Sequence, residues 1–376
     1  LSGAIPATFG FLKALQQLML YNNSLEGNLP HQLINVANLT RVNLSKNRLN
    51  GSIAALCSSQ SFLSFDVTDN EFEGEIPYQM GNSPSLQRLR LGNNKFSGEI
   101  PRTLAKIREL SLLDLSGNSL TEPIPAELSF CNKLAYIDLN SNLLFGQIPS
   151  WLEKLPELGE LKLSSNNFSG SLPLGLFKCS KLLVLSLNDN SLNGSLPSDI
   201  GDLAYLNVLR LDHKFSGPIP QEIGKLSKIY ELRLSRNNFN AEMPAEIGKL
   251  QNLQIILDLS YNNLSGQIPP AVGTLLKLEA LDLSHNQLTG EVPPHVGEMS
   301  SLGKLDLSYN NLQGKLDKQF SRWPDEAFEG NLQLCGSPPE RCHHDDASRS
   351  AGLNEPSVAI ISSISTLAAI ALLILA

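Results

Sequence analysis

Residues Leu278–Pro293 read LEALDLSHNQLTGEVP, and this arrangement of leucines, one asparagine, one glycine and one proline recurs almost from end to end of the chain. Aligned on the asparagine of L-x-x-L-x-L-x-x-N, most copies are 24 residues apart, as Asn286 and Asn310 are. One interval of 47 residues, from Asn190 to Asn237, holds a further copy without the asparagine. The sequence therefore contains thirteen units of one repeat.

Each part of the unit predicts a local structure. In Leu281-Asp282-Leu283 apolar and polar residues alternate, which is the period of a strand with one buried face and one wet face. The asparagine after the strand is expected to turn inward and bond backbone groups of the neighbouring loops. The Leu-x-Gly-x-Ile-Pro segment supplies a second inward pair of apolar residues, before a short helical turn on the outer side. Because no unit can bury its leucines alone, the units must stack.

A period in the twenties with this pattern is the signature of leucine-rich repeats. Over residues 1–342 the repeats with Leu-x-Gly-x-Ile-Pro resemble the plant-specific extracellular class. The expected fold is an α/β solenoid, a plant-type leucine-rich-repeat superhelix with a parallel β-sheet on its concave face. The chain opens within a unit, so we expect a fragment that lacks a leader, an N-terminal cap and earlier repeats.

Beyond the repeats of residues 1–316, residues 317–342 are expected to form a C-terminal cap. Its apolar residues are expected to cover the last open repeat, and they are Phe320, Trp323, Phe328, Leu332 and Leu334. Cys335 and Cys342 are expected to join in a disulfide, which implies an oxidising compartment. Residues 343–357 read as a polar juxtamembrane linker; no metal or other cofactor is expected there or elsewhere in the chain.

Residues 358–376 carry no charge. At ~1.5 Å per residue they extend over roughly 28 Å, close to the ~30 Å of a hydrocarbon core. We therefore expect a single C-terminal transmembrane helix, truncated at its far end, in the plasma membrane with the repeats outside the cell. Candidate glycosylation sites in Asn-x-Ser/Thr triplets are Asn22, Asn38, Asn43, Asn50, Asn167, Asn193 and Asn263. Cys57, Cys131 and Cys179 are expected to be free, buried, small apolar residues.

Four irregularities interrupt the repeat. One residue is missing within Leu206–Pro220, and no asparagine occupies the ladder position there, so the rung should be broken. One residue is extra within Leu253–Asn262, which predicts a bulge before the strand. Glu122 and Ala241 replace the usual glycine, so looser outer turns are expected at these two positions.

Composition and motifs exclude several functions. The net charge of −8 argues against nucleic acid, which requires a basic stripe. The chain has no Gly-rich phosphate loop, no Gly-x-Ser-x-Gly and no His-Glu-x-x-His, so no catalytic role is expected. A sheet of thirteen rungs spans roughly 60 Å at ~4.8 Å each, which suits a peptide or protein partner.

Ligand-binding candidates lie in the outward column between the two strand leucines. That column reads Met19, Asn43, Asp66, Arg90, Asp114, Asp138, Lys162, Ser186, Arg210, Arg233, Asp258, Asp282 and Asp306. Arg88 and Arg90 are two residues apart, so both should project from the concave face and grip one carboxylate or sulfate. Arg210 and Arg233, with Arg236 nearby, form a second basic spot. Asp258, Asp282 and Asp306 place three negative charges on successive strands.

The segment FSRWPDEAFEGNLQLCGSPPERC at Phe320–Cys342, together with ISSISTLAAIALLILA at Ile361–Ala376, is similar to the GASSHO/SCHENGEN receptor kinases. The resemblance implies an ectodomain that binds tyrosine-sulfated peptides and recruits a somatic-embryogenesis-type co-receptor kinase, with a Ser/Thr kinase in the full-length relatives. Arg88-x-Arg90 resembles the Arg-x-Arg pair that related receptors use on the C-terminal end of a peptide. The alternative is a kinase-less receptor-like protein that acts as a membrane adaptor in defence or development.

Overall fold

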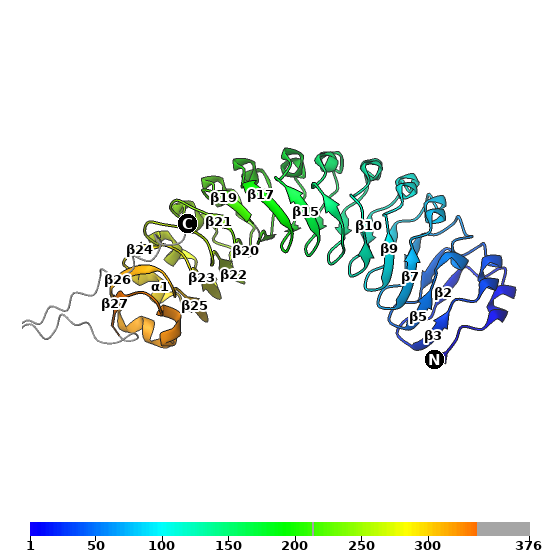
Figure 1. The fold of residues 1–376 in the computed structure, drawn as a ribbon, viewed down its shortest axis with the longest axis horizontal. Helices are drawn as coiled ribbons and strands as arrows, with labels where there is room; N and C mark the ends of the chain where they lie inside the picture. The colour runs from blue at the N-terminus through cyan, green and yellow to red at the C-terminus, as the bar shows by residue number, and fades with distance from the viewer. Residues whose placement is uncertain (213, 337–376) are drawn as a thin grey trace, which may run out of the picture. The chain divides into compact units, whose positions relative to one another are not determined.

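The computed structural model describes residues 1–212 and 214–336. The chain divides into two compact units, Leu1–Glu340 and Arg341–Ala376, and the described residues belong to the first. In this unit the repeats stack along a curve, with a 13-stranded parallel sheet on the inner side and short helices on the outer side (Figure 1). The thirteen repeats and the parallel concave sheet predicted from the sequence are therefore confirmed.

The strands of this main sheet are three residues long and follow one another in chain order. They are β2 (Gln17–Met19), β4 (Arg41–Asn43), β6 (Ser64–Asp66), β8 (Arg88–Arg90), β10 (Leu112–Asp114), β12 (Tyr136–Asp138), β14 (Glu160–Lys162), β16 (Val184–Ser186), β18 (Val208–Arg210), β20 (Glu231–Arg233), β22 (Ile256–Asp258), β23 (Ala280–Asp282) and β25 (Lys304–Asp306).

A second set of parallel strands, which the sequence did not predict, is formed by the Leu-x-Gly segments. The first sheet of this set contains β1 (Ser2–Gly3), β3 (Ser24–Asn28), β5 (Arg48–Gly51), β7 (Glu71–Glu75), β9 (Lys95–Gly98) and β11 (Ser119–Leu120). The second contains β13 (Phe145–Gly146), β15 (Asn167–Gly170), β17 (Ser191–Ser195), β19 (Lys214–Gly217) and β21 (Asn238–Phe239). The third contains β24 (Thr289–Gly290), β26 (Asn311–Lys315) and β27 (Gln333–Cys335).

On the outer side each repeat closes with a helical turn, most of them 3₁₀ turns. The 3₁₀ turns are η1 (Ala7–Phe11), η2 (His31–Asn35), η3 (Ala54–Leu56), η4 (Tyr78–Asn82), η5 (Arg102–Lys106), η6 (Ala126–Phe130), η7 (Ser150–Lys154), η8 (Leu174–Lys178), η9 (Ser198–Asp202), η10 (Gln221–Lys225), η11 (Ala245–Lys249), η12 (Pro270–Thr274), η13 (Lys318–Arg322) and η14 (Asp325–Phe328); α1 (Pro294–Glu298) is α-helical. A proline precedes most of them, because its fixed φ suits the entry to a helix.

The asparagine ladder holds neighbouring repeats together. The side-chain nitrogen of Asn286 donates to the carbonyls of Leu259 and Leu283 at 3.0 and 3.1 Å. Its side-chain oxygen accepts the amide of Leu264 at 3.0 Å. Leu281 and Leu283 are fully buried, and Asp282 between them is half-buried. The predicted geometry of the repeat is therefore confirmed.

Two changes of repeat length leave the main sheet in register. The extra residue forms a bulge at Ile255, before β22. Ile256 pairs with Glu231 of β20 but with no residue of β23, as expected next to a bulge. In the short repeat, position 213 lies outside the described residues, so the broken rung remains a prediction. On the next rung, Asn237 donates to the carbonyl of Leu211 at 2.6 Å, and β18 pairs on both sides.

Glu122 and Ala241 coincide with the two interruptions of the second set of strands, which breaks after β11 and after β21. Both residues have positive φ, 71° and 64°, where the other repeats mostly place glycine. An L-residue in this region is sterically strained. The named strands end here, but hydrogen bonds still cross both positions: the amide of Leu143 donates to the carbonyl of Leu120, and that of Ser265 to the carbonyl of Ala241, each at 2.9 Å. The pairing is therefore shortened and not lost.

The C-terminal cap buries most of its predicted residues. Phe320, Trp323, Phe328 and Leu334 are buried, but Leu332 is 99% exposed, so its assignment to the cap core was wrong. Leu332 points outward because its neighbour Asn331 is the buried residue. Cys335 is disulfide-bonded. Cys342 and residues 343–376, including the predicted linker and membrane span, lie outside the described residues.

Two further sequence predictions concern buried and membrane-spanning segments. Cys57, Cys131 and Cys179 are free and buried, as expected. Burial raises the pKa of Cys57 to about 12 and those of Cys131 and Cys179 to about 11. Among the described residues, none of the helices has the length and apolarity that a bilayer crossing requires.

Candidate ligand-binding face

The main sheet presents two columns of outward side chains, because the first and third residues of each strand face the same way. In one column the strand register runs from Met19 to Asp306 in the order read from the sequence. The second column runs from Gln17 to Lys304, and the residue between the columns, such as Leu281, is buried. These two columns form the concave face.

Arg88 and Arg90 project from the concave face as predicted, with Leu89 buried between them. Nη1 of Arg90 lies 3.7 Å from the carboxylate of Asp66 on the neighbouring strand. Arg88 is exposed and makes no ion pair with any described residue. One guanidinium is therefore partly screened, and the other is open to an anionic group of a ligand.

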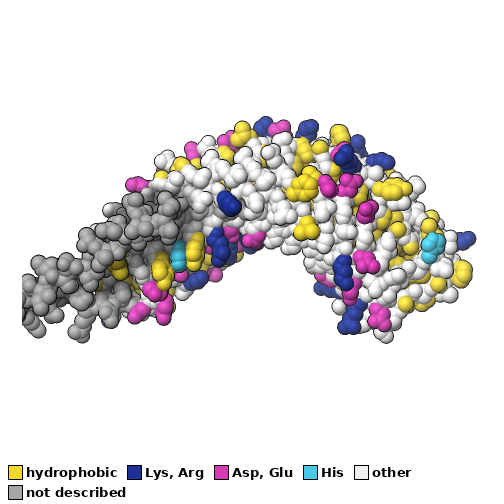
Figure 2. All heavy atoms as spheres, in the orientation of Figure 1, with side chains coloured by type: hydrophobic (Ala, Val, Ile, Leu, Met, Phe, Trp, Pro, Cys, Tyr) yellow, Lys and Arg dark blue, Asp and Glu magenta, His cyan; other side chains and the backbone are white. Residues whose placement is uncertain are grey.

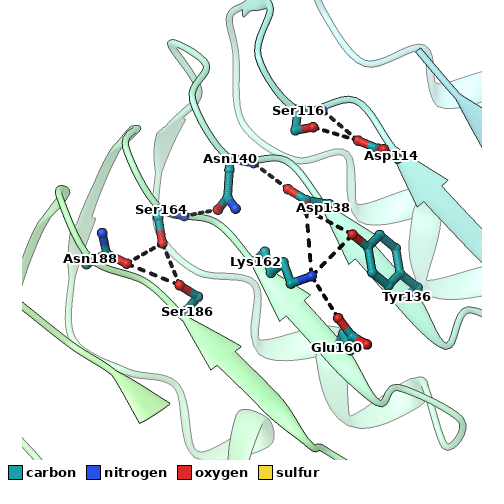
Figure 3. A network of polar contacts seen from close by, with 10 residues as sticks. All are labelled: Asp114, Ser116, Tyr136, Asp138, Asn140, Glu160, Lys162, Ser164, Ser186 and Asn188. Atoms are coloured by element: carbon teal, nitrogen blue, oxygen red, sulfur yellow. Dashed lines mark hydrogen bonds and ion pairs between the residues drawn. The ribbon is translucent and has the colours of Figure 1, made fainter. Parts of the chain in front are cut away.

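Lys162, in the middle of the concave face, is enclosed by its neighbours (Figure 3). Its ammonium lies 2.8 Å from Glu160 and 4.0 Å from Asp138, and it donates to the Tyr136 hydroxyl at 3.2 Å. Burial lowers the pKa of Lys162, but the hydrogen bonds with Glu160 and Tyr136 outweigh it, and the pKa is raised. The charges at this point are therefore paired within the protein.

The next rung carries a small uncharged residue. Ser186 is buried, lies within 2.9 Å of the Ser164 hydroxyl, and donates to the side-chain oxygen of Asn188 at 3.1 Å (Figure 3). In the second column the same rung carries Val184, followed by Val208. Next to Arg210, the concave face therefore carries small, uncharged side chains.

Arg210 and Arg233 both contact Glu231, a buried residue with only 3% of its surface exposed. Nε and Nη2 of Arg210 each donate to the carboxylate at 2.9 Å, and Nε of Arg233 donates to it at 2.6 Å. Burial raises the pKa of Glu231, but the two guanidinium groups outweigh it and hold the pKa below its ordinary value. The predicted basic spot is therefore a clamp around a buried carboxylate.

Arg236 does not join this clamp. Its guanidinium lies 5.5 Å from the ring centroid of Tyr261, which stacks on His285 with 4.0 Å between centroids. His285 contacts Tyr309 in turn, at 4.5 Å. All four residues have positive φ and directly precede a ladder asparagine, which places them outside the two columns. Arg236 thus takes no part in the contacts with Glu231, and its role in ligand binding remains a prediction.

Asp258, Asp282 and Asp306 stack on β22, β23 and β25 as predicted. Each aspartate is held by the serine two residues later; Asp282 accepts the amide and hydroxyl of Ser284 at 3.1 and 2.7 Å. Burial raises the pKa of Asp282, and the charges of Asp306 and Asp258 add to this effect. The C-terminal part of the concave face is therefore an acidic strip with fixed side chains.

On the face shown in Figure 2, acidic and basic side chains lie close to one another. Of the seven glycosylation candidates, five asparagines are exposed: Asn22, Asn38, Asn167, Asn193 and Asn263. Asn43 and Asn50 are half-buried, and Asn43 accepts the amide and hydroxyl of Ser45 within the concave face.

Of the second column, the sequence prediction included only Arg88. Glu231 and Tyr136, which determine how Arg210, Arg233 and Lys162 are oriented, both belong to it. The signal was present, because Glu231 stands where the neighbouring repeats have Val208 and Ile256. Reading both outward columns, instead of one, would have found it.

Comparisons with known proteins agree with this architecture. A family model described as Leucine Rich Repeat matches residues 85–107, 109–131, 133–155, 181–203, 255–275, 277–299 and 301–323. The LRR receptor-like serine/threonine-protein kinase GSO1 of Arabidopsis thaliana is 64% identical over 62 residues, which cover 16% of this chain and 5% of that protein.

Two solved structures are similar over most of the chain. The LRR ectodomain of GASSHO1/SCHENGEN3 from Arabidopsis thaliana, in complex with CASPARIAN STRIP INTEGRITY FACTOR 2, is 66% identical with a TM-score of 0.90. That match covers 91% of this chain and 41% of the other. The Arabidopsis receptor kinase HAESA, in complex with the peptide hormone IDA and the co-receptor SERK1, is 34% identical with a TM-score of 0.79; the match covers 90% of this chain and 61% of the other.

The fold and the repeats thus define the chain as a leucine-rich-repeat solenoid with the fold of plant receptor ectodomains. More narrowly, it is similar to the ectodomain of the receptor kinase GASSHO1/SCHENGEN3, of which it spans less than half the solved length. The described residues form repeats and a cap, and none of them forms a kinase domain.

Proposed function

We propose that this chain is the extracellular ligand-binding region of a plant cell-surface receptor kinase, which recognises a peptide on its concave face and pairs with a co-receptor kinase. The observation that carries the proposal is the 66% identity to an ectodomain solved with a bound peptide factor, at a TM-score of 0.90. HAESA, which is more distant, was solved with both a peptide hormone and a co-receptor.

The shape and chemistry of the concave face support a peptide ligand. Thirteen rungs at ~4.8 Å extend over roughly 60 Å, and an extended peptide of about 18 residues has the same length at ~3.3 Å per residue. The residues proposed to contact it are Arg88, Arg90, Arg210, Arg233 and the aspartates of the acidic strip. Arg236 is proposed to contact it only at the edge, because it packs on Tyr261.

The location outside the cell is supported by two independent observations. Cys335 is disulfide-bonded, which is typical of oxidising compartments. Five Asn-x-Ser/Thr asparagines are exposed, as an attached glycan requires. We propose that the repeats face the cell exterior and that residues 358–376 anchor the chain in the plasma membrane.

Calorimetric titration of the purified chain with CASPARIAN STRIP INTEGRITY FACTOR 2, in tyrosine-sulfated and unsulfated forms, tests this function. We expect saturable heat with the sulfated peptide, weakened at least tenfold by Arg88→Ala plus Arg90→Ala, or about 1.4 kcal/mol. The matched control is Arg102→Ala plus Arg108→Ala, on the outer side. Absence of heat with a folded chain would reject the proposal, and unchanged heat in the first variant would remove Arg88 and Arg90 from the site.

A further inference from the structure

Arg233 and Asp258 are direct neighbours in the register of the main sheet, yet no ion pair joins them among the described residues. Arg233 instead donates to Glu231 on its own strand. Arg210, one strand earlier, donates to the same carboxylate through two nitrogens. Both guanidinium groups therefore turn toward each other, away from the acidic strip.

Two cations at this spacing repel each other, and the buried Glu231 offsets that repulsion. One arginine would suffice to pair one carboxylate. The three groups of the cluster sum to a charge of +1, and the half-buried carboxylate of Asp212, which acts electrostatically on both arginines, brings the local total to zero. Neighbouring repeats place Val208 and Ile256 in the position of Glu231, which shows that the stack does not need a carboxylate there.

The hydrogen bonds to Glu231 leave some N–H groups of each guanidinium free to bind a ligand. They use Nε and Nη2 of Arg210 and Nε of Arg233, so Nη1 of Arg210 and both terminal nitrogens of Arg233 retain N–H groups for a ligand. The two arginine side chains are 41% and 36% exposed, whereas that of Glu231 is 4% exposed. The positive side of the cluster therefore faces the groove and the negative side faces the protein.

From this geometry we propose that Arg210 and Arg233 form an anion-binding subsite, pre-oriented by Glu231, for a carboxylate or sulfate group of a molecule lying on the concave face. Guanidinium forks match such oxyanions through paired N–H donors. Ser186, Val184 and Val208 form the neutral floor beside the subsite, which accommodates the uncharged body that carries the anion. Glu231 is a positioning residue, because it acts through the two arginines.

The proposal deepens the proposed function, but small anions test it without any peptide. Crystals of the chain are soaked in sodium selenate, whose selenium gives an anomalous signal. We expect a peak between the guanidinium groups of Arg210 and Arg233. In parallel, the melting temperature is titrated with selenate or acetate at constant ionic strength, since a ligand that binds only the folded state raises it.

Arg210→Gln and Arg233→Gln each leave Glu231 paired with the remaining arginine and remove one of the two guanidinium groups proposed to hold the anion. We expect each to lower the apparent affinity for selenate at least fivefold. Arg108→Gln is the control, because it changes the net charge of the protein equally but lies on the outer side. It should change the apparent affinity for selenate less than twofold. A stronger response to acetate than to selenate assigns the subsite to carboxylates, and the reverse assigns it to sulfate.

A soaked crystal without a peak at the two arginines, or equal anion dependence in all variants, overturns the subsite. The two proposals fail separately. Peptide heat without a selenate peak preserves the proposed function alone, whereas a selenate peak without peptide heat preserves the anion subsite alone.

Discussion

The side-chain oxygen of Asn331 accepts the amide of Leu312 at 3.0 Å, across 19 residues of sequence, where the preceding rung from Asn310 to Leu288 spans 22. Asn331 also donates to the carbonyls of Leu307 and Phe328. The cap therefore continues the asparagine ladder of the repeats, although it no longer follows their sequence pattern.

Replacing Asn331 by alanine should loosen the last repeats. The change removes the partner of the Leu312 amide and of the Phe328 carbonyl, whereas the carbonyl of Leu307 still accepts from Asn310. We therefore expect the free energy of unfolding of this end to fall by about 1–3 kcal/mol. Hydrogen exchange of the amides in β26 measures it. Asn311→Ala, at an exposed neighbouring position, is the control. Equal protection in the two variants would contradict a ladder role for Asn331.

Replacing Ala241 by glycine should stabilise the solenoid. Ala241 has φ of 64°, a conformation in which a Cβ costs about 1–2 kcal/mol, and the greater chain entropy of glycine offsets about 0.5–1 kcal/mol of the gain. We expect a net increase of up to about 1 kcal/mol in the free energy of unfolding, measured by urea denaturation. Ala245→Gly, within η11, should destabilise instead. If both substitutions destabilise equally, the positive φ of Ala241 stores no strain that glycine relieves.

Replacing Asp282 by asparagine should stabilise the protein at pH 7 and have less effect in acid. A folded-state pKa above the ordinary value means that ionisation opposes folding, so Asp282 costs stability as the pH rises past its unfolded-state pKa, about 3.9. Asparagine keeps the acceptor, as Asn43 shows with Ser45 in the same column. We expect a gain of about 0.2–1 kcal/mol, the range of a cross-strand charge pair.

Denaturation curves at pH 7 and pH 3 check this expectation, with Asp202→Asn on the outer side as the charge-matched control. The gain of Asp282→Asn should shrink between the two pH values and exceed that of the control at pH 7. A gain that grows in acid would show that the sign of the effect is reversed.

Much of the fold follows from the sequence because each repeat obeys the same steric rule. The alternation in Leu281-Asp282-Leu283 fixes which side chains are buried, and the asparagine fixes how neighbouring repeats bond. The second set of strands was missed because two to five residues of Leu-x-Gly are too short for a visible period, and they pair only when neighbours stack.

The candidate site was only partly predictable. The order of the outward side chains from Met19 to Asp306 was predicted correctly, because it depends only on the spacing of the repeats. The orientation of Arg210 and Arg233 depends on a third residue, Glu231, whose burial cannot be read from one strand. Leu332 was misassigned for a related reason: an apolar residue in an irregular loop carries no periodicity, and Asn331 took the inward position.

The bulge before β22 and the shortened loop after β18 both change the length of a repeat, yet the column from Arg210 through Arg233 to Asp258 stays in register. These two changes in loop length thus leave the side chains of the concave face in place. A lineage of such solenoids is free to gain or lose loop residues without shifting the side chains of the concave face, and to revise those side chains one point substitution at a time.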